Sequence, residues 1–377
     1  MVGGTPSAPL EALSLFLCGD VMTGRGIDQV LPHPVPPRLY EQYVSDARDY
    51  VELAEARNGP LSKPLSFEYP WGEALAVLEK AAPDVRLINL ETSVTTSEES
   101  WPDKGIHYRM SPANAACLAA ARIDCCALAN NHVLDWGYAG LTETLGVLHG
   151  LGIATAGLGE NQEAAQRPAV LEVGARSRVV VYSLGAASSG IPPEWAAGVD
   201  RPGVNLLPDL SSSTARRIGE RVRSIQREGD ITIASIHWGD NWGYEVPSQH
   251  RAFAHALIDE AGVDVLHGHS SHHPRGIELY QGRLILYGCG DFLNDYEGIH
   301  GYEAFRGDLT LMYLASVDAV SGRLLALRMV PMQLRRLQLH RASDRDSEWL
   351  CNLMDREGRH LGTRARMDAD GTLVLQQ

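Results

Sequence analysis

The sequence predicts an α/β protein, a layered sandwich of helices and mainly parallel strands followed by a C-terminal antiparallel hairpin. Over the first 300 residues, short apolar runs with strand character alternate with segments of helical spacing, and this β-α-β order is typical of a parallel sheet. After residue 305 the pattern changes to two longer strand-like runs, 309–317 and 324–332. A short turn, Asp-Ala-Val-Ser-Gly, joins these two runs, which indicates a hairpin.

Strands are predicted where short apolar runs end in polar or glycine-rich residues. The first run, Leu13 to Cys18, leads into a glycine-rich turn that carries Asp20. Further strands are expected at 84–90, 125–129, 153–156, 179–184, 230–236, 263–266, 284–287 and 372–376.

Helices are predicted from helical spacing and from start and stop signals. The segment 71–82 ends before Pro83, and 112–121 opens on Pro112, a residue favoured in the first helical turn. The remaining helices are expected at 137–150, 211–228, 248–261 and near 347–354. Residues 31–66, proline-rich and then polar, are predicted to form a long connection that covers a site.

These elements suggest one main domain. We expect residues 1–10 to be a flexible tail and residues 11–300 to form the domain. Residues 301–377, with the hairpin and a helix, are predicted to pack on the same domain.

Composition argues against several classes of partner. The net charge of −14 disfavours a nucleic-acid partner, because phosphate neutralisation needs clustered Lys and Arg. No run of 18 apolar residues occurs, and the N-terminus lacks the basic and apolar regions of a secretory signal, so we expect no direct membrane insertion. The six cysteines form no C-x-x-C motif and most lie in apolar runs, which favours reduced thiols and a cytoplasmic location.

Polar side chains that can bind metal follow many of the predicted strands. Because parallel strands bring their carboxyl ends to one edge of a sheet, these side chains are expected to converge. Mixed carboxylate, carboxamide and imidazole ligation suits one or two ions of Mn, Fe or Zn, and two such ions about 3.5–4 Å apart can activate a shared water. The residues concerned are Asp20, Glu91, Asn131, His132, His237, His269 and His272.

Other catalytic motifs are absent from the sequence. The G-x-S-x-G elbow of serine hydrolases does not occur, and neither does a P-loop or a Rossmann G-x-G-x-x-G. The Asn-Asn-His segment at 130–132 is also compatible with a simple turn, since Asn tolerates left-handed backbone.

Six ordered motifs in this chain resemble those of the CapA family. They are G-D-V-M-x-G-R (19–25), N-L-E-T (89–92), Y-R-M-S-P (108–112), A-N-N-H-x-x-D-x-G (129–137), H-W-G (237–239) and G-H-x-x-H (268–272), and Y-G-C-G-D-F (287–292) is similar to the family's Y-S-L-G-N-F. These capsule, or poly-gamma-glutamate, biosynthesis proteins belong to the calcineurin-like metallophosphoesterase superfamily. The resemblance covers about residues 13–300 and implies a metallophosphatase-like fold.

The resemblance also implies roles for individual residues. Asp20 would be a ligand of one metal, Glu91 the bridging carboxylate and Asn131 a ligand of the second metal. His237, His269 and His272 would complete the two shells. The superfamily's D-x-H begins here as Asp20-Val21-Met22, so one ion or two are expected.

The expected catalytic and substrate-binding residues surround these ligands. His132 would be the substrate-facing acid. Asp135, which lies three residues after it, and Arg25 would be further catalytic residues. Arg25 and Arg109 would contact an anionic group of the substrate. The remaining expected substrate contacts are Asn130, Trp238 and His273.

Two functions from different classes follow. The first is a metal-dependent hydrolase acting on an anionic phosphoester or a γ-glutamyl amide. The alternative is a non-catalytic, metal-containing accessory protein of a polyglutamate synthase complex. A ligase-like role is less favoured because no ATP-binding motif is present. The expected partners are therefore a small anionic or polyglutamate-like substrate and a biosynthetic complex.

Overall fold

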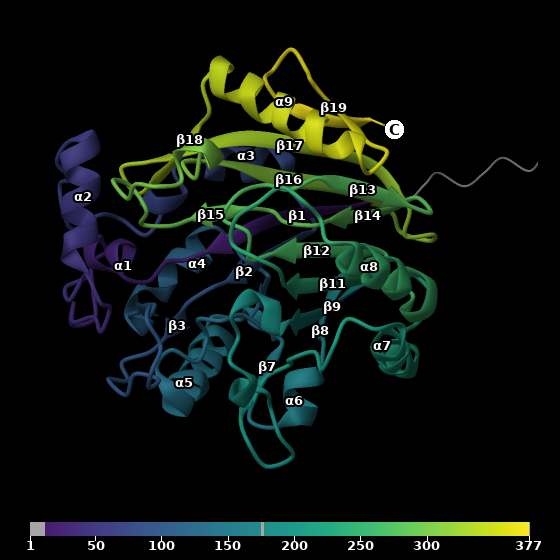
Figure 1. Cartoon of the computed structure of the whole chain (residues 1–377), viewed down its shortest axis with the longest axis horizontal. Helices are drawn as coiled ribbons and strands as arrows, with labels where there is room; N and C mark the ends of the chain where they lie inside the picture. The colour runs from purple at the N-terminus through teal and green to yellow at the C-terminus, as the bar shows by residue number, and fades with distance from the viewer. Residues whose placement is uncertain (1–11, 175–176, 377) are drawn as a thin grey trace, which may run out of the picture.

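Two β-sheets packed face to face form the centre of the molecule (Figure 1). The computed structural model describes residues 12–174 and 177–376, so the predicted tail at 1–10 lies outside the described residues. The first sheet has the order β19 (Arg364–Met367), β20 (Leu373–Gln376), β17 (Leu324–Arg335), β16 (Leu309–Asp318), β1 (Ala12–Val21), β2 (Val85–Leu90), β5 (Cys125–Ala127), β6 (Ala154–Ala156). Two strands branch from this order, β15 (Asp291–Leu293) beside β1 and β18 (Gln338–Arg341) beside β17.

The second sheet has six strands. Their order is β13 (Ile277–Tyr280), β14 (Arg283–Leu286), β12 (Val265–His269), β11 (Asp230–His237), β9 (Ser177–Gly185), β8 (Ala169–Val173). Its four central strands are parallel, and the edge strands β13 and β8 are antiparallel to their neighbours. In the first sheet β1, β2, β5 and β6 are parallel, whereas β16 and β17 form the predicted antiparallel hairpin. The predicted α/β class and the hairpin are therefore confirmed.

Strand β1 shows how the sequence builds these layers. Successive side chains of a strand point to opposite faces, so an apolar run buried on both sides can serve two cores. Leu13, Leu15 and Leu17 face the core between the sheets, while Phe16 and Cys18 face the core beneath the outer helices. Both sheets contribute side chains to the core between them. This core contains residues of β2 from the first sheet and of β11 and β14 from the second.

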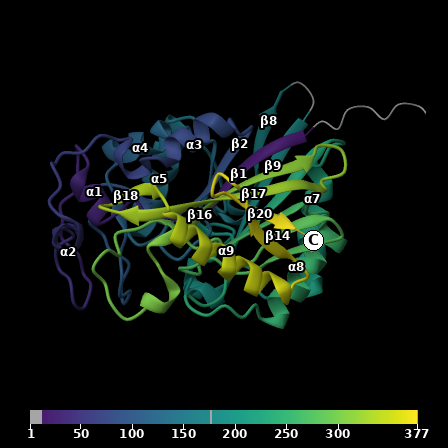
Figure 2. The same cartoon turned by 90° about the horizontal axis from the view of Figure 1, so that it is seen from above.

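Helices cover both outer faces of the sandwich. The first sheet is covered by α3 (Ala74–Ala81), α4 (Ala116–Ala120) and α5 (Gly137–Gly150), and the second by α7 (Ser212–Ile225) and α8 (Ser248–Ala261). Helix α9 (Asp344–Arg359) lies along the hairpin and contacts both β17 and β13, so it connects the two sheets at one side (Figure 2). None of the helices in the described ranges is long and apolar enough to cross a bilayer.

The smaller elements lie in the connections. The two-stranded pairs are β3 (Ser93–Val94) with β4 (Arg109–Met110) and β7 (Leu158–Gly159) with β10 (Gly203–Val204). The remaining α-helices are α1 (Gly26–Val30), α2 (Arg48–Asn58) and α6 (Gln162–Gln166).

Several predicted boundaries are wrong for identifiable reasons. The helix predicted at 71–82 starts only at Ala74, because a 3₁₀ turn and Gly72 precede it. Helix α2 lies within the segment predicted as an irregular connection; it buries only Tyr50, Val51 and Ala54, so its apolar pattern is weak. The edge strands β8 and β13 were not expected, whereas α5 and α8 have the predicted bounds.

The predicted turn after Cys18 is also wrong, because β1 continues through Gly19 and Asp20 to Val21. Glycine is required here by close packing. A Cβ atom on Gly19 would lie 1.5 Å from the carbonyl oxygen of Gly290, and the amide of Asp20 donates to that oxygen at 2.9 Å. This contact brings Asp20 level with Asp291 of β15.

Helix α9 provides a test of the sandwich packing. Leu350 is fully buried in the core between the sheets, so Leu350→Ala should lower the free energy of unfolding by about 2–5 kcal/mol through lost burial and a residual cavity. Urea denaturation followed by circular dichroism measures this change. Glu348→Ala, at an exposed position of the same helix, should change it by less than about 0.5 kcal/mol. Equal effects of the two substitutions would contradict the packing described for α9.

Candidate metal centre

The two sheets bring their polar strand ends together at one place. Asp20 lies near the end of β1, and Glu91 directly follows β2. His237 and His269 end β11 and β12, where they are register neighbours in parallel strands. Asn131 belongs to the loop after β5. The predicted convergence of these ligands is therefore present, with three from the first sheet and two from the second.

Asp20, His237 and His269 form the tightest group of potential ligands. One ligand atom from each lies within 4.8 Å of the other two, and all three residues are buried. Asp20 Oδ1 is 3.8 Å from His269 Nδ1 and 4.0 Å from His237 Nδ1, while the two Nδ1 atoms are 2.8 Å apart. A carboxylate and two imidazoles are typical donors for Mn, Fe or Zn.

Glu91 and Asn131 lie on the other side of His237. The Nε2 atom of His237 is 2.9 Å from Asn131 Oδ1 and 3.7 Å from Glu91 Oε1. His237 therefore has Asp20 and His269 on its Nδ1 side and Glu91 and Asn131 on its Nε2 side.

His272 is placed differently from the other predicted ligands. Its Nδ1 is 2.8 Å from Asp291 Oδ1, and Asn294 donates from Nδ2 to the second oxygen of that carboxylate. Asp291 was not expected as a site residue, although it follows the strand-like run 284–287 just as the other candidates follow theirs. The structure therefore adds a carboxylate to the predicted set.

The donor set fits a divalent cation. Burial raises the pKa of Asp20 to about 7, with the charge of Asp291 as the next cause, and burial followed by the charge of Asp20 raises the pKa of Glu91. Burial lowers the pKa of both His237 and His269, so each imidazole is neutral and can act as a ligand. Buried carboxylates that repel one another, next to neutral imidazoles, are stabilised by a cation.

His132 lies beside this group with one nitrogen directed at it. Its Nε2 is 3.8 Å from Glu91 Oε1, and its Nδ1 is 2.7 Å from Asp135 Oδ2. Lys104 Nζ contacts Asp135 Oδ1 at 2.6 Å and lies 3.1 Å from His132 Nδ1. Burial and then the charge of Lys104 lower the pKa of His132 to about 4. Burial raises the pKa of Asp135, but Lys104 and His132 outweigh burial and the pKa is lowered.

Other polar groups position the ligands. Asn89 donates from Nδ2 to Asp20 Oδ1 at 2.7 Å, and the amide of Ser270 donates to the other oxygen. Ser235 Oγ is 2.9 Å from His269 Nε2, which leaves Nδ1 of that ring toward Asp20. Asn89 and Ser235 could have been suspected from their places near strand ends, whereas Lys104 lies in a polar loop without any signal in the sequence.

The structure assigns Asn130 a role in holding the loop, and its side chain is fully used there. Its Nδ2 donates to Asn89 Oδ1 and to the Leu90 carbonyl. Its Oδ1 accepts from the amides of His132 and Val133. Both polar atoms of this carboxamide therefore have partners within the protein, and the expected substrate contact of Asn130 stays a prediction.

Arg25 is likewise neutralised within the protein. Two of its guanidinium nitrogens donate to Asp295, the third donates to Glu41 and Tyr50, and the Tyr50 and Tyr108 rings pack against its face at 3.9 and 4.1 Å. These carboxylates satisfy the charge of Arg25 within the protein, and its expected catalytic role stays a prediction.

Arg109 is buried away from solvent and bound to the backbone. Its guanidinium donates to the carbonyls of Ser97 and Pro36 and lies 3.9 Å from the centre of the Trp136 ring. These contacts tie two connecting loops together, and the expected contact with a substrate anion stays a prediction.

Trp238 and His273 are packing residues. Trp238 is stacked on His250 at 4.5 Å, and its indole donates to the Tyr287 carbonyl. His273 is fully buried and lies 4.7 Å from the Phe305 ring. Both residues therefore contribute to packing, and their expected substrate contacts stay predictions.

Comparisons with known proteins agree with the motifs. A probable polyglutamine synthesis accessory protein of Mycobacterium tuberculosis is 51% identical over 366 residues, which cover 97% of this chain and 96% of that protein. The PGA biosynthesis protein CapA of Bacillus subtilis is 26% identical over 76% of this chain and 64% of its own length. A solved phosphatase from Mycoplasma pneumoniae has a TM-score of 0.47 at 14% identity, covering 86% of this chain and 94% of its own; a match this distant says nothing about activity.

The family match covers most of the structure described above. It extends over residues 14–296, which include every potential metal ligand at the junction of the two sheets. The chain therefore belongs to the bacterial capsule synthesis protein family PGA_cap.

Proposed function

We propose that this protein is a metal-dependent hydrolase of an anionic substrate, either a phosphoester or a γ-glutamyl amide. The observation that carries the proposal is the buried group of Asp20, His237 and His269 with His132 alongside it. A purely structural metal site would not need His132, a further histidine that is hydrogen-bonded and directed at the same group.

One or two ions of Mn, Fe or Zn would be held by these donors. Asp20, His237 and His269 would hold one ion, and Glu91 with Asn131 would contribute to a second. When bound, such ions act as Lewis acids toward the scissile group and lower the pKa of water.

His132 is the residue we assign to proton transfer. Asp135 and Lys104 hold its Nδ1 side, which leaves Nε2 facing the space beside Glu91. In hydrolysis a water oxygen bonds to phosphorus or carbonyl carbon, the bond to the leaving oxygen or nitrogen breaks, and that atom takes up a proton. Because its lowered pKa keeps His132 neutral, its Nε2 can accept the proton that the attacking water loses and pass it to the leaving atom.

A second function is favoured by the name of a close relative. The Mycobacterium tuberculosis protein is described as a probable accessory protein of polyglutamine synthesis. In that role this chain would assist a polyglutamate synthase complex without turnover of its own, and the metal would stabilise the fold.

Metal content tests the assignment of the ligands. Protein purified without a His-tag should contain Mn, Fe or Zn by inductively coupled plasma mass spectrometry. Asp20→Asn and His269→Asn should each lose most of the bound metal, because each removes a donor from the buried group. His255→Asn, on α8 and bonded to Glu278, should retain it. A wild-type protein that binds none of these metals even after reconstitution would rule out the metal-dependent hydrolase.

Turnover of a generic phosphodiester or γ-glutamyl substrate tests the role of His132. His132→Ala should reduce kcat by about 10²–10⁴-fold, which is the usual contribution of a general acid or base. Its metal content should stay at the wild-type level, because His132 is not assigned as a ligand. Loss of metal in this variant would make His132 a ligand, and unchanged turnover would exclude it from proton transfer.

A further inference from the structure

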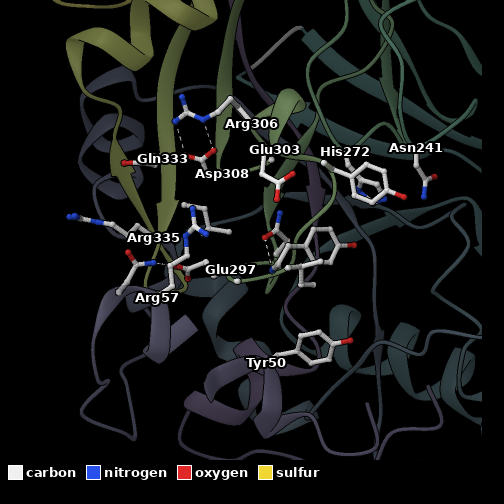
Figure 3. A pocket seen from close by; sticks show the side chains of 18 of the residues that line it. Tyr50, Arg57, Asn241, His272, Glu297, Glu303, Arg306, Asp308, Gln333 and Arg335 are labelled. Atoms are coloured by element: carbon white, nitrogen blue, oxygen red, sulfur yellow. Dashed lines mark hydrogen bonds and ion pairs between the residues drawn. The ribbon is translucent and has the colours of Figure 1, made fainter. Parts of the chain in front are cut away.

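A cavity of about 660 Å³ lies beside the metal centre (Figure 3). His272, which pairs with Asp291, lies on its wall and connects it to the centre. Its other sides come from α2, from β17 and from the loop that follows β15. A volume of this size accommodates a whole small ligand, well beyond a single phosphate or carboxylate group.

An aromatic stack ends at this cavity. Trp242 and Tyr302 line it and are stacked on each other with centroids 4.0 Å apart and an interplanar angle of 3°. Phe305 packs against Trp242 from within the protein, at 5.1 Å. Tyr302 is 50% exposed, so the last ring of the stack offers surface to a further planar group.

A polar group stands next to this stack. The carboxamide of Asn241 lines the same cavity, is exposed, and has no hydrogen-bond partner among the residues at 12–174 and 177–376. A carboxamide offers both a donor and an acceptor. The carboxamide of Asn241 can therefore form hydrogen bonds with the edge of a heterocycle, which a plain hydrocarbon ring does not allow.

The charges of the cavity do not favour a polyanion. Four arginines and three carboxylates line it. Arg25 is already paired with two carboxylates, and Arg306 is paired with Asp308 and Asp346. Arg57 and Arg335 form no ion pair within the described residues. Glu297 accepts hydrogen bonds from Asn58 and from two backbone amides, and Glu303 pairs with His300, so the lining arginines exceed the lining carboxylates by only one. A chain of carboxylates would gain little electrostatic energy here.

We propose that the cavity between Tyr302, Asn241 and the metal centre binds the base of a nucleoside phosphate, whose phosphate reaches the centre. The base would stack on Tyr302 and bond at its edge to Asn241, and the phosphate would lie toward His272. This inference rests on the proposed function, because it places the scissile phosphoester of the hydrolase at Asp20, His237 and His269.

Calorimetric binding of a matched pair of probes to the full chain tests the inference. Adenosine 5′-monophosphate should bind at least about 10-fold more tightly than ribose 5-phosphate, which has the same phosphate and no base. Tyr302→Ala should remove this preference and leave the affinity for ribose 5-phosphate unchanged, while Tyr302→Phe should keep it. Tyr138→Ala, at a half-buried surface tyrosine on α5 that does not line the cavity, is the matched control and should keep it as well.

Each alternative result has a distinct meaning. Equal affinity for the two probes, or a preference that survives Tyr302→Ala, overturns the base subsite even if the protein hydrolyses other phosphoesters. Tighter binding of a γ-linked glutamate trimer than of adenosine 5′-monophosphate, indifferent to Tyr302→Ala, also overturns it. A base preference that depends on Tyr302 in a protein that hydrolyses no phosphoester supports the subsite and excludes the phosphoester form of the proposed hydrolase.

Discussion

The main physical constraint on this structure is that three buried carboxylates lie close together. Asp20, Glu91 and Asp291 lie near one another without an arginine or lysine paired to any of them in the described residues. Removing a carboxylate from water costs several kcal/mol unless a positive charge or strong hydrogen bonds compensate. Hydrogen bonds from Asn89 and Ser270 offset part of this cost for Asp20. A divalent cation of the kind proposed above would offset the rest.

The two halves of the centre come from different sheets. Asp20, Glu91 and Asn131 follow strands of the first sheet, and His237 and His269 end strands of the second. The site therefore exists only when the core between the sheets is packed, and its geometry is set by rigid strand ends rather than by mobile loops. The approach of β1 to β15, which only glycine at position 19 allows, is one such fixed constraint.

Sequence patterns predicted the layers and most of the metal donors, because both follow from strand periodicity. The apolar runs of β1, β2, β11 and β12 were visible, and so were the polar residues at their ends. The structure gives Arg25, Arg109, Asn130, Trp238 and His273 contacts within the protein, and their expected roles toward substrate stay predictions. Each of these side chains has partners that are distant in sequence, such as Asp295 for Arg25 and Pro36 for Arg109, and no local pattern reveals them. Lys104 was missed for the same reason.

The residues proposed to bind metal and several residues that line the cavity lie in different parts of the chain. All the donors proposed for metal lie within residues 14–296, the range shared with the family. Several walls of the neighbouring cavity, including Tyr302, Arg306 and Gln333, lie beyond residue 296. Family membership therefore bears on the candidate metal centre more than on the cavity beside it. Since the cavity wall is aromatic and nearly neutral, the part of the chain outside the family match is where this protein can differ in substrate from its relatives.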